Sequence, residues 1–401
     1  MIDYRFIEPL DVLYLRGNKL FEGAGAHGAA QMPPWPSLAA GALRSRMLAD
    51  AGVDLAAYAR GESRPTDPRL AEVLGTPAEP GDFRITVFTL AQRVNNAIEP
   101  CFPLPADVVV TDNDGLGDAG YLAPTVLHPA LRSSAGLPQL PLRRAAQPAK
   151  RAGGLWLNAD GWRAYLSGER LTGRQLLRSA DLWQTDPRLG IALDGGLGTV
   201  QPGLLYTAET VAFARAGRDP NTGETRCAAG LLVGVRGADG TTPADGLLRL
   251  GGDGRGALVS ACAPDLPEPD WTRIADERRF RLVLATPGIF AEGWRLPGLR
   301  PDNVWQGPEG SAARLVAAAV HRADVISGWD LAKWSQKKGG PKSAQRVAPA
   351  GSVYWFEDFE GSVAMLRKLA AEGFWAISDY PDRTRRAEGF NNVFTAAWPQ
   401  Q

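Results

Sequence analysis

The sequence has 401 residues with 44 basic and 44 acidic side chains, so its formal net charge is zero. This length exceeds the usual size of one hydrophobic core and predicts two compact units, and a hydrophobic fraction of 44% excludes a disordered chain. With no net charge, only local clusters of charge can indicate a nucleic-acid partner. No apolar run approaches the ~18 residues of a membrane span, and acidic residues occupy the N-terminus where a signal peptide would be apolar, so we expect a cytoplasmic protein without membrane contact.

The N-terminal part predicts an α+β unit. A strand is expected over residues 2–15, followed by a loop of small residues and a helix over 37–48 with its apolar residues on one face. Further strands are expected over 83–92, 204–214 and 227–235. We interpret residues 1–270 as a ferredoxin-like domain with large insertions, which ends near a proline-rich stretch.

Residues 271–401 predict a second ferredoxin-like domain. Strands are expected over 279–286, 325–329, 352–357 and 390–398, and helices over 311–320 and 362–372. The order β-α-β-β-α-β is that of the ferredoxin-like (RRM-like) fold, in which two helices cover one face of a four-stranded antiparallel sheet. Gly373 is expected to end the second helix.

Neither the cysteine spacing nor the sequence motifs indicate a bound metal or cofactor. Cys101, Cys227 and Cys262 are odd in number and far apart, which argues against a disulfide framework and a zinc site. The sequence lacks G-x-x-x-x-G-K-[ST], and no G-x-G-x-x-G follows a strand of a βαβ unit. We therefore expect neither a metal nor a cofactor.

Two basic runs without acidic residues are candidates for RNA contact. The first lies between Asp118 and Asp160 among prolines and glycines and contains Arg132, Arg143, Arg144, Lys150 and Arg151. The second covers residues 331–346 and contains Lys333, Lys337, Lys338, Lys342 and Arg346, with Trp334 among them. Such clusters bind phosphates, and a neighbouring aromatic ring stacks on an unpaired base. The alternative is a pair of solvated loops that lysine keeps soluble.

The segment RLGGDGRGALV, residues 249–259, contains a Gly-Gly-Asp like the metal-binding turn of polymerases and cyclases. Two-metal chemistry needs paired carboxylates, whereas here a glycine follows Asp253 and arginines flank it, so we do not expect cyclase chemistry. Gly252, Gly254 and Arg255 fit the approach of an RNA phosphate to the backbone better. A plain tight turn is the alternative.

His27 is the best catalytic candidate, because it follows the first strand in a glycine-rich loop. As a general base it needs a second group, for which Tyr14 or Lys19 could serve. Contact with RNA and a structural role are the alternatives for this side chain. His128 and His321 show no metal-ligand spacing and are interpreted as structural.

Arg44 is expected on the exposed side of the first helix, directed toward an RNA groove, because Leu38, Ala42 and Met47 form the apolar arc. A planar guanidinium there suits bidentate phosphate binding. With Arg16, Lys19 and His27, it completes the predicted RNA-binding set.

Several blocks resemble one protein family over nearly the whole length. They are EPLDVLYLRG (8–17), PPWPSLAAGALRSRML (33–48), RLGIALDGGLGTVQPGLLYTAE (188–209), RLGGDGRGA (249–257), LATPGIFAEGW (284–294), VISGWDLAKW (325–334) and RVAPAGSVYWFE (346–357). The chain resembles the RAMP-superfamily subunit of the type III-B CRISPR (Cmr) effector complex. One departure is GFNNVF (389–394), where Asn391 replaces an expected glycine; asparagine tolerates positive φ.

The resemblance implies a non-catalytic RNA-binding subunit. Members of this family anchor the 5′ handle of the crRNA, and they bridge the large polymerase/cyclase-like Cmr subunit to the first backbone Cmr subunit. Two ferredoxin-like domains are part of the same expectation. The leading alternative is a metal-independent endoribonuclease that processes crRNA through His27, and a scaffold without RNA contact is a third.

Overall fold

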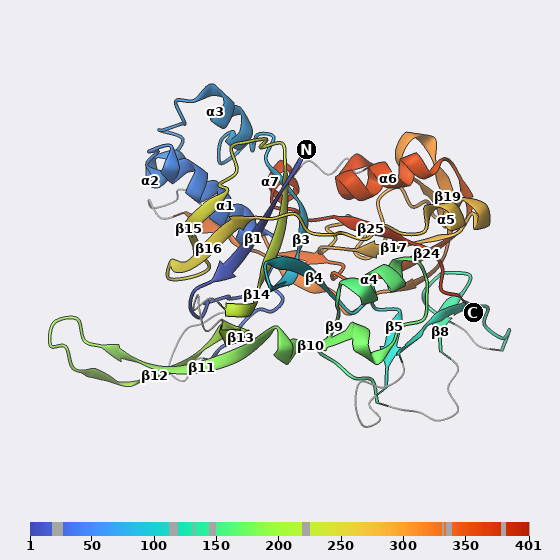
Figure 1. The fold of residues 1–401 in the computed structure, drawn as a ribbon, viewed down its shortest axis with the longest axis horizontal. Coiled ribbons are helices and arrows are strands. Elements are labelled where there is room, and N and C mark those ends of the chain that lie inside the picture. The colour runs from blue at the N-terminus through green and yellow to red at the C-terminus, as the bar shows by residue number, and fades with distance from the viewer. Residues whose placement is uncertain are drawn as a thin grey trace.

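The computed structural model describes residues 1–17, 27–111, 119–130, 133–143, 150–218, 225–330, 333, 339–377 and 382–400. A large antiparallel sheet dominates the N-terminal part, with its strands in the order β10-β9-β4-β3-β14-β1-β16-β15 and with β13 paired to β14 (Figure 1). The bounds are β1 (Ile2–Pro9), β3 (Arg84–Val94), β4 (Ala97–Pro103), β9 (Leu155–Leu157), β10 (Leu176–Arg178), β13 (Arg215–Arg218), β14 (Thr225–Arg236), β15 (Asp245–Leu250) and β16 (Arg255–Ala261).

Three helices accompany this sheet: α1 (Ser37–Asp50), α2 (Leu55–Ala59) and α3 (Pro68–Leu74). The predicted helix 37–48 is confirmed and extends to Asp50. Its buried Leu43 and Met47 belong to the same core cluster as Ile7 of β1 and Val233 of β14. The apolar face of α1 therefore packs on the sheet, which leaves its other side for the groove described below.

A second antiparallel sheet forms the C-terminal part, in the order β18-β19-β24-β17-β25. Its strands are β17 (Phe280–Leu284), β18 (Val304–Gln306), β19 (Ala312–Ala319), β24 (Val353–Glu360) and β25 (Val393–Ala396). Helices α5 (Trp271–Glu277) and α6 (Val363–Glu372) lie beside it in Figure 1. Phe280 and Phe356 stack at 4.9 Å between ring centroids in its core.

The predicted helix over residues 311–320 is wrong, because this segment is strand β19. It pairs with β18 on one side and β24 on the other, and Leu315, Val316 and Ala317 are fully buried. An apolar run buried on both faces of a sheet has no alternation that would reveal a strand. Helix propensity of alanine is a weak preference, and the tertiary pairing overrides it here.

Other predicted elements are confirmed with different bounds, and β3, β12 (Val200–Phe213), β14 and β24 are longer than predicted. The strand over 2–15 ends at Pro9, after which Leu13 and Tyr14 form only isolated bridges. The strand over 325–329 is divided into β20 and β21 because Gly328 has a φ of +128°. The strand expected over 390–398 is β25. The second predicted helix of this domain is α6, which ends at Gly373 as expected. One of the two helices predicted to cover the C-terminal sheet is strand β19. The two predicted ferredoxin-like domains are therefore not established, whereas the mixed α and β content is.

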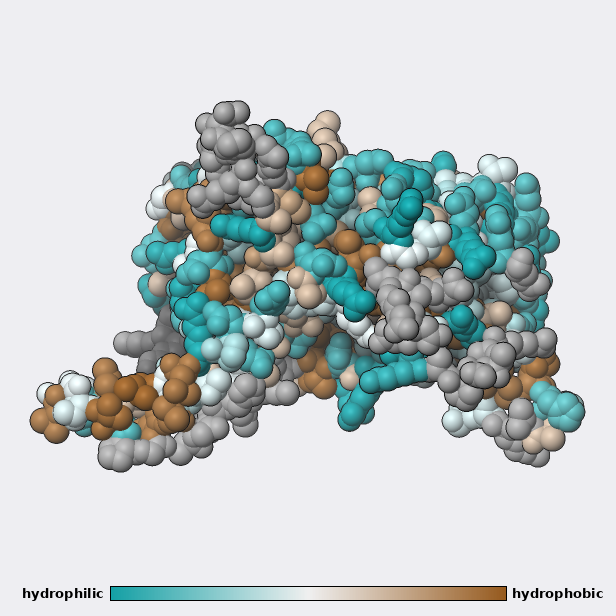
Figure 2. Space-filling model, turned by 60° about the horizontal axis from the view of Figure 1, so that its bottom comes forward, coloured by the Kyte–Doolittle hydropathy of each residue, from teal (hydrophilic) through white to brown (hydrophobic). Residues whose placement is uncertain are grey.

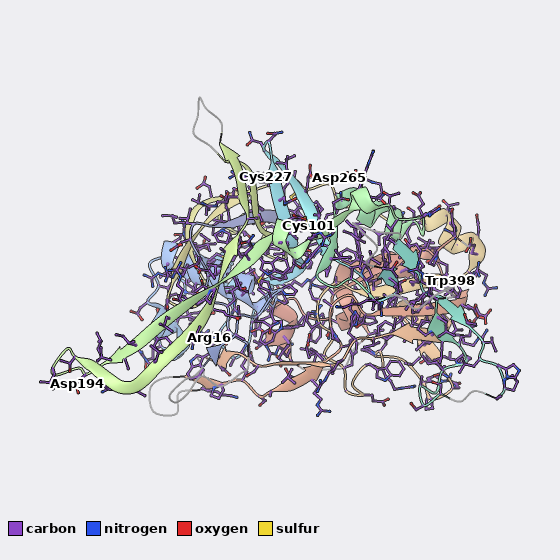
Figure 3. All side chains as sticks on the ribbon, turned by 90° about the horizontal axis from the view of Figure 1, so that it is seen from below. Arg16, Cys101, Asp194, Cys227, Asp265 and Trp398 are labelled. Atoms are coloured by element: carbon purple, nitrogen blue, oxygen red, sulfur yellow. The ribbon has the colours of Figure 1, made fainter. Side chains whose placement is uncertain are left out.

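A long hairpin projects from the body of the molecule, as Figures 1 and 3 show. It consists of β11 (Trp183–Leu193) and β12 (Val200–Phe213), and the two-residue β2 (His27–Gly28) pairs with β12 in parallel. Asp194 lies at its outer tip in Figure 3. Short two-stranded sheets and helices complete the fold: β5 (Val108–Val110) with β6 (Ala119–Tyr121), β7 (Ala123–Thr125) with β8 (Leu140–Leu142), β20 (Asp324–Ile326) with β23 (Gln345–Val347), β21 (Trp329–Asp330) with β22 (Gly340–Pro341), α4 (Ala159–Leu166) and α7 (Arg383–Ala387).

The two parts share one buried polar junction. Arg281 of β17 donates from Nη1 to Asp107 Oδ2 at 2.5 Å, and both side chains are fully buried. Tyr165 of α4 donates its hydroxyl to Asp107 Oδ1 at 2.9 Å, and its backbone carbonyl accepts from Arg281. Burial raises the pKa of Asp107, while the adjacent guanidinium opposes that shift by favouring the charged form. Residues from both sides of the predicted boundary at 270 thus meet in one core, and that boundary remains a prediction.

Replacing Asp107 by asparagine should lower the free energy of unfolding by about 3–5 kcal/mol, because Arg281 would stay buried without a counter-charge. Tyr165→Phe should cost about 1–3 kcal/mol, since one hydrogen bond to the carboxylate is lost. The exposed pair of Arg300 and Asp302 at 2.8 Å provides the control, and Asp302→Asn should cost less than about 1 kcal/mol. Denaturant unfolding measures all three; equal losses for Asp107→Asn and Asp302→Asn would contradict the assigned role.

Candidate nucleic-acid interface

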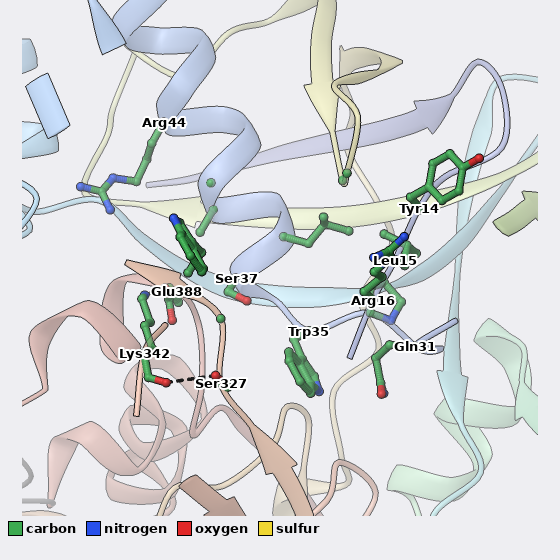
Figure 4. Close-up of a pocket in the computed structure, with 18 of the residues that line it drawn as sticks. Tyr14, Leu15, Arg16, Gln31, Trp35, Ser37, Arg44, Ser327, Lys342 and Glu388 are labelled. Carbon is green, nitrogen blue, oxygen red and sulfur yellow. Dashed lines mark hydrogen bonds and ion pairs between the residues drawn. The ribbon is translucent and has the colours of Figure 1, made fainter. Parts of the chain in front are cut away.

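A groove lies where the start of α1 faces residues from the C-terminal part (Figure 4). Its first hollow has a volume of about 650 Å³. A second hollow of about 540 Å³ adjoins it and shares six of its lining residues. These are Gly41, Arg44, Trp329, Lys342, Arg385 and Glu388. The two hollows therefore form one continuous depression, which we call the furrow.

Basic side chains exceed acidic ones by only one over the whole furrow, because its second hollow adds Lys333 but also Asp330 and Asp382. Four cationic side chains and two acidic ones line its first hollow: Arg16, Arg44, Lys342 and Arg385 against Asp253 and Glu388. Glu388 pairs with Lys342 and accepts from Arg385 Nη1 at 3.0 Å. Glu388, Lys342 and Arg385 form a trio with a net charge of +1, because one carboxylate lies between two cations. The ion pairs also fix the positions of these charges.

Arg385 holds the trio in place from α7. Its guanidinium also donates to the Ser327 carbonyl and to Gln345 Oε1, both at 3.0 Å. The Ser327 hydroxyl in turn donates to the Lys342 carbonyl at 3.0 Å, which is the dashed contact in Figure 4. Segments far apart in the sequence are thus locked together at one wall of the furrow.

Arg44 lies on the groove side of α1, as the helical geometry predicts. It is half-buried, and Nη2 donates to the carbonyl of Leu74 at the end of α3, 3.1 Å away. Burial raises the pKa of the neighbouring Tyr58, and the charge of Arg44 opposes that shift. A guanidinium has five N–H donors, so this anchorage leaves donors for an anion in the furrow.

The glycine turn before β16 forms another wall. Gly251, Asp253 and Gly254 have φ values of +74°, +57° and +61°, the left-handed conformation that glycine adopts without strain. Gly252 lines the furrow, and its N–H donates to the Tyr14 carbonyl at 2.9 Å. Arg255 is directed to Asp11 at 3.1 Å and lies over the Tyr14 ring, so this arginine is engaged within the fold.

The first basic run is not brought into the furrow. Arg143 is half-buried and donates to the Val109 carbonyl at 3.1 Å, and Lys150 is exposed elsewhere. Arg151 is exposed and lines a separate hollow next to the furrow. Arg132 and Arg144 lie outside the described residues.

The second basic run contributes Lys333 and Lys342 to the furrow. Lys333 donates from Nζ to the Pro341 carbonyl at 3.2 Å. Arg346 is exposed on β23 and pairs with Val325 in the backbone ladder, away from the furrow lining. Lys19, Trp334, Lys337 and Lys338 lie outside the described residues. For His27, the structure describes the backbone pairing with Thr207 and not the side chain.

Sequence reasoning missed four residues that line the furrow, two tryptophans and one ion pair. Trp35 and Trp329 line it, and Trp329 is 58% exposed, which is unusual for so large an apolar ring. Trp329 lies in the VISGWDLAKW block, which was quoted only for the family resemblance. No pattern in the neighbouring residues indicates that its ring lines a groove. Arg385 and Glu388 are spaced i, i+3, a signal that indicates a helical ion pair rather than a site.

Asn391 keeps the turn in which a glycine was expected. It has a φ of +65° and is fully buried, and its Oδ1 accepts from the Ile289 N–H at 2.6 Å. Asn392 donates to the Ile85 carbonyl of β3 at 3.2 Å, so the loop joins the two sheets. Because Asn391 and Asn392 are buried, this loop stabilises the fold and does not present these side chains to a partner.

The hairpin presents an exposed apolar face. Ile191 pairs with Leu205 and Leu193 with Val200, so these side chains share one face with Leu189. Leu189 is 70% exposed and Leu193 58% exposed. Figure 2 shows apolar surface along the projecting hairpin. Contiguous exposed apolar surface of this kind marks an interaction site.

The described residues include no group of three or more His, Cys, Asp or Glu side chains placed to hold a metal ion. In the same part of the chain, no helix is both long and apolar enough to cross a membrane.

A family model described as CRISPR-associated protein (Cas_Cmr3) matches residues 5–398. The chain belongs to this family. The resemblance to Cmr subunits is thereby confirmed. The Cas_Cmr3 match covers both sheets, the hairpin and every wall of the furrow, so these features are all parts of the family region.

Solved structures give similar chains at low identity. A chain of the cryo-EM structure of the type III-B Cmr-beta bound to cognate target RNA has a TM-score of 0.47 and 14% identity, with 97% of this chain and 96% of that chain covered. A chain from the state bound to cognate target RNA and AMPPnP has a TM-score of 0.45 and 13% identity, with 96% and 92% covered. No curated protein matches the sequence.

Proposed function

We propose that the chain is a non-catalytic RNA-binding subunit of a type III-B CRISPR effector complex, and that the furrow holds the 5′ handle of the crRNA. The observation that carries this proposal is the convergence of Arg16, Arg44 and Lys342 with two tryptophans on one concave surface. The buried Arg385 holds Lys342 in place there through Glu388. The cations bind phosphates, and exposed rings stack on unpaired bases.

A single strand suits this surface better than a duplex. Sequence-specific recognition of RNA uses splayed bases that stack on aromatic rings, whereas duplex RNA is bound through its shape and backbone. Trp329 is exposed and lines the same hollow as these cations, where a splayed base would meet it. The glycine turn at Gly252 lets the strand approach the backbone closely.

The hairpin supports the second part of the proposal, contact with other proteins of the complex. We assign its apolar face, Leu189, Ile191, Leu193, Val200 and Leu205, to the neighbouring backbone subunit, because a stripe without charges is suited to protein burial. The large polymerase/cyclase-like subunit is the other expected protein partner. The two units of the chain are proposed to be ferredoxin-like, and the complex to act in the cytoplasm.

The double variant Arg44→Ala, Lys342→Ala should weaken binding to crRNA and reduce the slope of log affinity against log salt by about 1.4, that is about 0.7 per lost phosphate contact. The double variant Lys368→Ala, Arg300→Ala is the matched control, because it also removes two charges, from exposed pairs with Glu309 and Asp302 outside the furrow. Arg44→Lys should cost affinity although it keeps the charge, since the bidentate fork is lost. Fluorescence anisotropy across a salt series measures each. Normal affinity combined with a lower melting temperature in Arg44→Ala would make this residue purely structural.

Incubation of the purified full chain with repeat RNA in EDTA should leave the RNA intact. The proposal assigns no catalytic residue, and a general base alone, without a partner, does not cleave RNA efficiently. Denaturing gels over a time course measure the result, with His27→Ala in parallel. Cleavage that His27→Ala abolishes would replace the binding function with that of a metal-independent endoribonuclease.

Replacing Leu189, Ile191 and Leu205 together by serine should abolish co-purification with the backbone Cmr subunit and leave the melting temperature nearly unchanged, because these side chains are already exposed. Leu247→Ser on β15 is the control, since Leu247 is also exposed but lies on the large sheet. Normal assembly of the triple variant would refute the assignment of the hairpin.

A further inference from the structure

A third hollow, of about 680 Å³, opens between the two sheets beside the furrow. It shares Gln31, Pro34 and Trp35 with the furrow, so a strand lying in one reaches the mouth of the other. We call this hollow the side pocket. Its volume falls in the range of about 300–1,000 Å³ that is typical of pockets for small organic ligands.

The side pocket has aromatic walls and few polar groups. Trp156 is nearly fully buried, and its ring stands at 84° to that of Trp183, with 5.4 Å between centroids. The indole N–H of Trp156 donates to Ser179 Oγ at 3.2 Å, so its polar atom is already satisfied. The rings of Trp35 and Trp183 are only half-buried. Two partly accessible indoles beside a concave apolar surface suit a flat aromatic ligand.

Three titratable side chains of the side pocket are exposed, whereas its other polar lining residues include the buried Thr89 and Thr286. Arg151, His321 and Asp324 line it, and all three are exposed. Arg151 makes one long contact, 3.5 Å from Nη2 to the Val108 carbonyl, which leaves its guanidinium available for a phosphate. Burial and the charge of Arg151 lower the pKa of His321, while Asp324 opposes this shift. The side pocket thus offers an exposed cation and an exposed carboxylate beside its indole rings.

We propose that the side pocket takes one unstacked nucleobase of the RNA strand that lies in the furrow, with Arg151 on its phosphate and Asp324 accepting from an exocyclic amino group of the base. This inference rests on the proposed function. A nucleobase matches the combination of flat apolar faces and polar edge, and a carboxylate accepts hydrogen bonds from an exocyclic amino group, as Asp and Glu do from cytosine N4. A preference for adenine, guanine or cytosine over uracil follows, because uracil has no amino group.

Two glycines allow the furrow and the side pocket to be blocked separately. A Cβ at Gly153 in the side pocket, or at Gly41 in the furrow, would meet no atom within 4 Å, and neither glycine has a positive φ. Phenylalanine at either site therefore fills the respective hollow without backbone strain. The probe is crRNA that carries a single 2-aminopurine at successive positions of the handle, since stacking on an indole quenches this base.

Gly153→Phe should weaken binding of the full chain about tenfold, the range expected for one lost stacked base, and leave the salt slope nearly unchanged if Arg151 still reaches its phosphate. It should also restore the fluorescence of 2-aminopurine at one handle position. Asp324→Asn should reduce the preference for an amino-bearing base over uracil at that position, with normal melting temperature.

The outcomes separate the two proposals. If Gly41→Phe loses affinity while Gly153→Phe binds as the unchanged protein does and alters no 2-aminopurine signal, the furrow stands and the side pocket is refuted. If neither substitution affects binding, the proposed function itself fails. An unaltered base preference in Asp324→Asn refutes the assigned amino contact.

Discussion

The buried pair of Arg281 and Asp107 is the constraint on which the arrangement of the two sheets depends. A charge taken out of water requires a partner at close range, and here the partner comes from a loop that follows β4. Tyr165 satisfies the second carboxylate oxygen, so α4 is fixed by the same contact. The N-terminal and C-terminal parts are thereby joined at a buried contact, and the hydrogen bond from Asn392 to the Ile85 carbonyl joins them at a second place.

Local sequence patterns were sufficient to predict the elements that have one exposed face. The periodicity of Ser37–Asp50 and the Gly373 stop of Val363–Glu372 reflect forces that act within a few residues. Strand β19 could not be recognised, because core clusters on both sides of its sheet bury its two faces, Leu315 in one cluster and Val316 in another, which removes the alternation. Tertiary pairing alone decided its conformation.

The candidate site was predictable in part for the same reason. Arg44 followed from helix geometry, and Lys342 from a run without acidic residues. Arg255 belongs to an equally suggestive block, yet Asp11 engages it from a distant loop. Trp35 and Arg385 come from opposite ends of the chain, and only the folded arrangement places them on one surface. A sequence pattern describes the residues of one segment. It does not tell which segments lie side by side in the folded chain.

The pairing of Arg385 with Glu388 has a consequence for the time at which the site appears. Both residues lie near the end of the 401-residue chain, whereas Arg16 and Arg44 lie near its beginning. The two walls of the furrow are therefore far apart in sequence, and neither wall forms the hollow on its own. Both sheets must fold and pack together before the furrow exists, so the furrow forms late in folding, after the first helix.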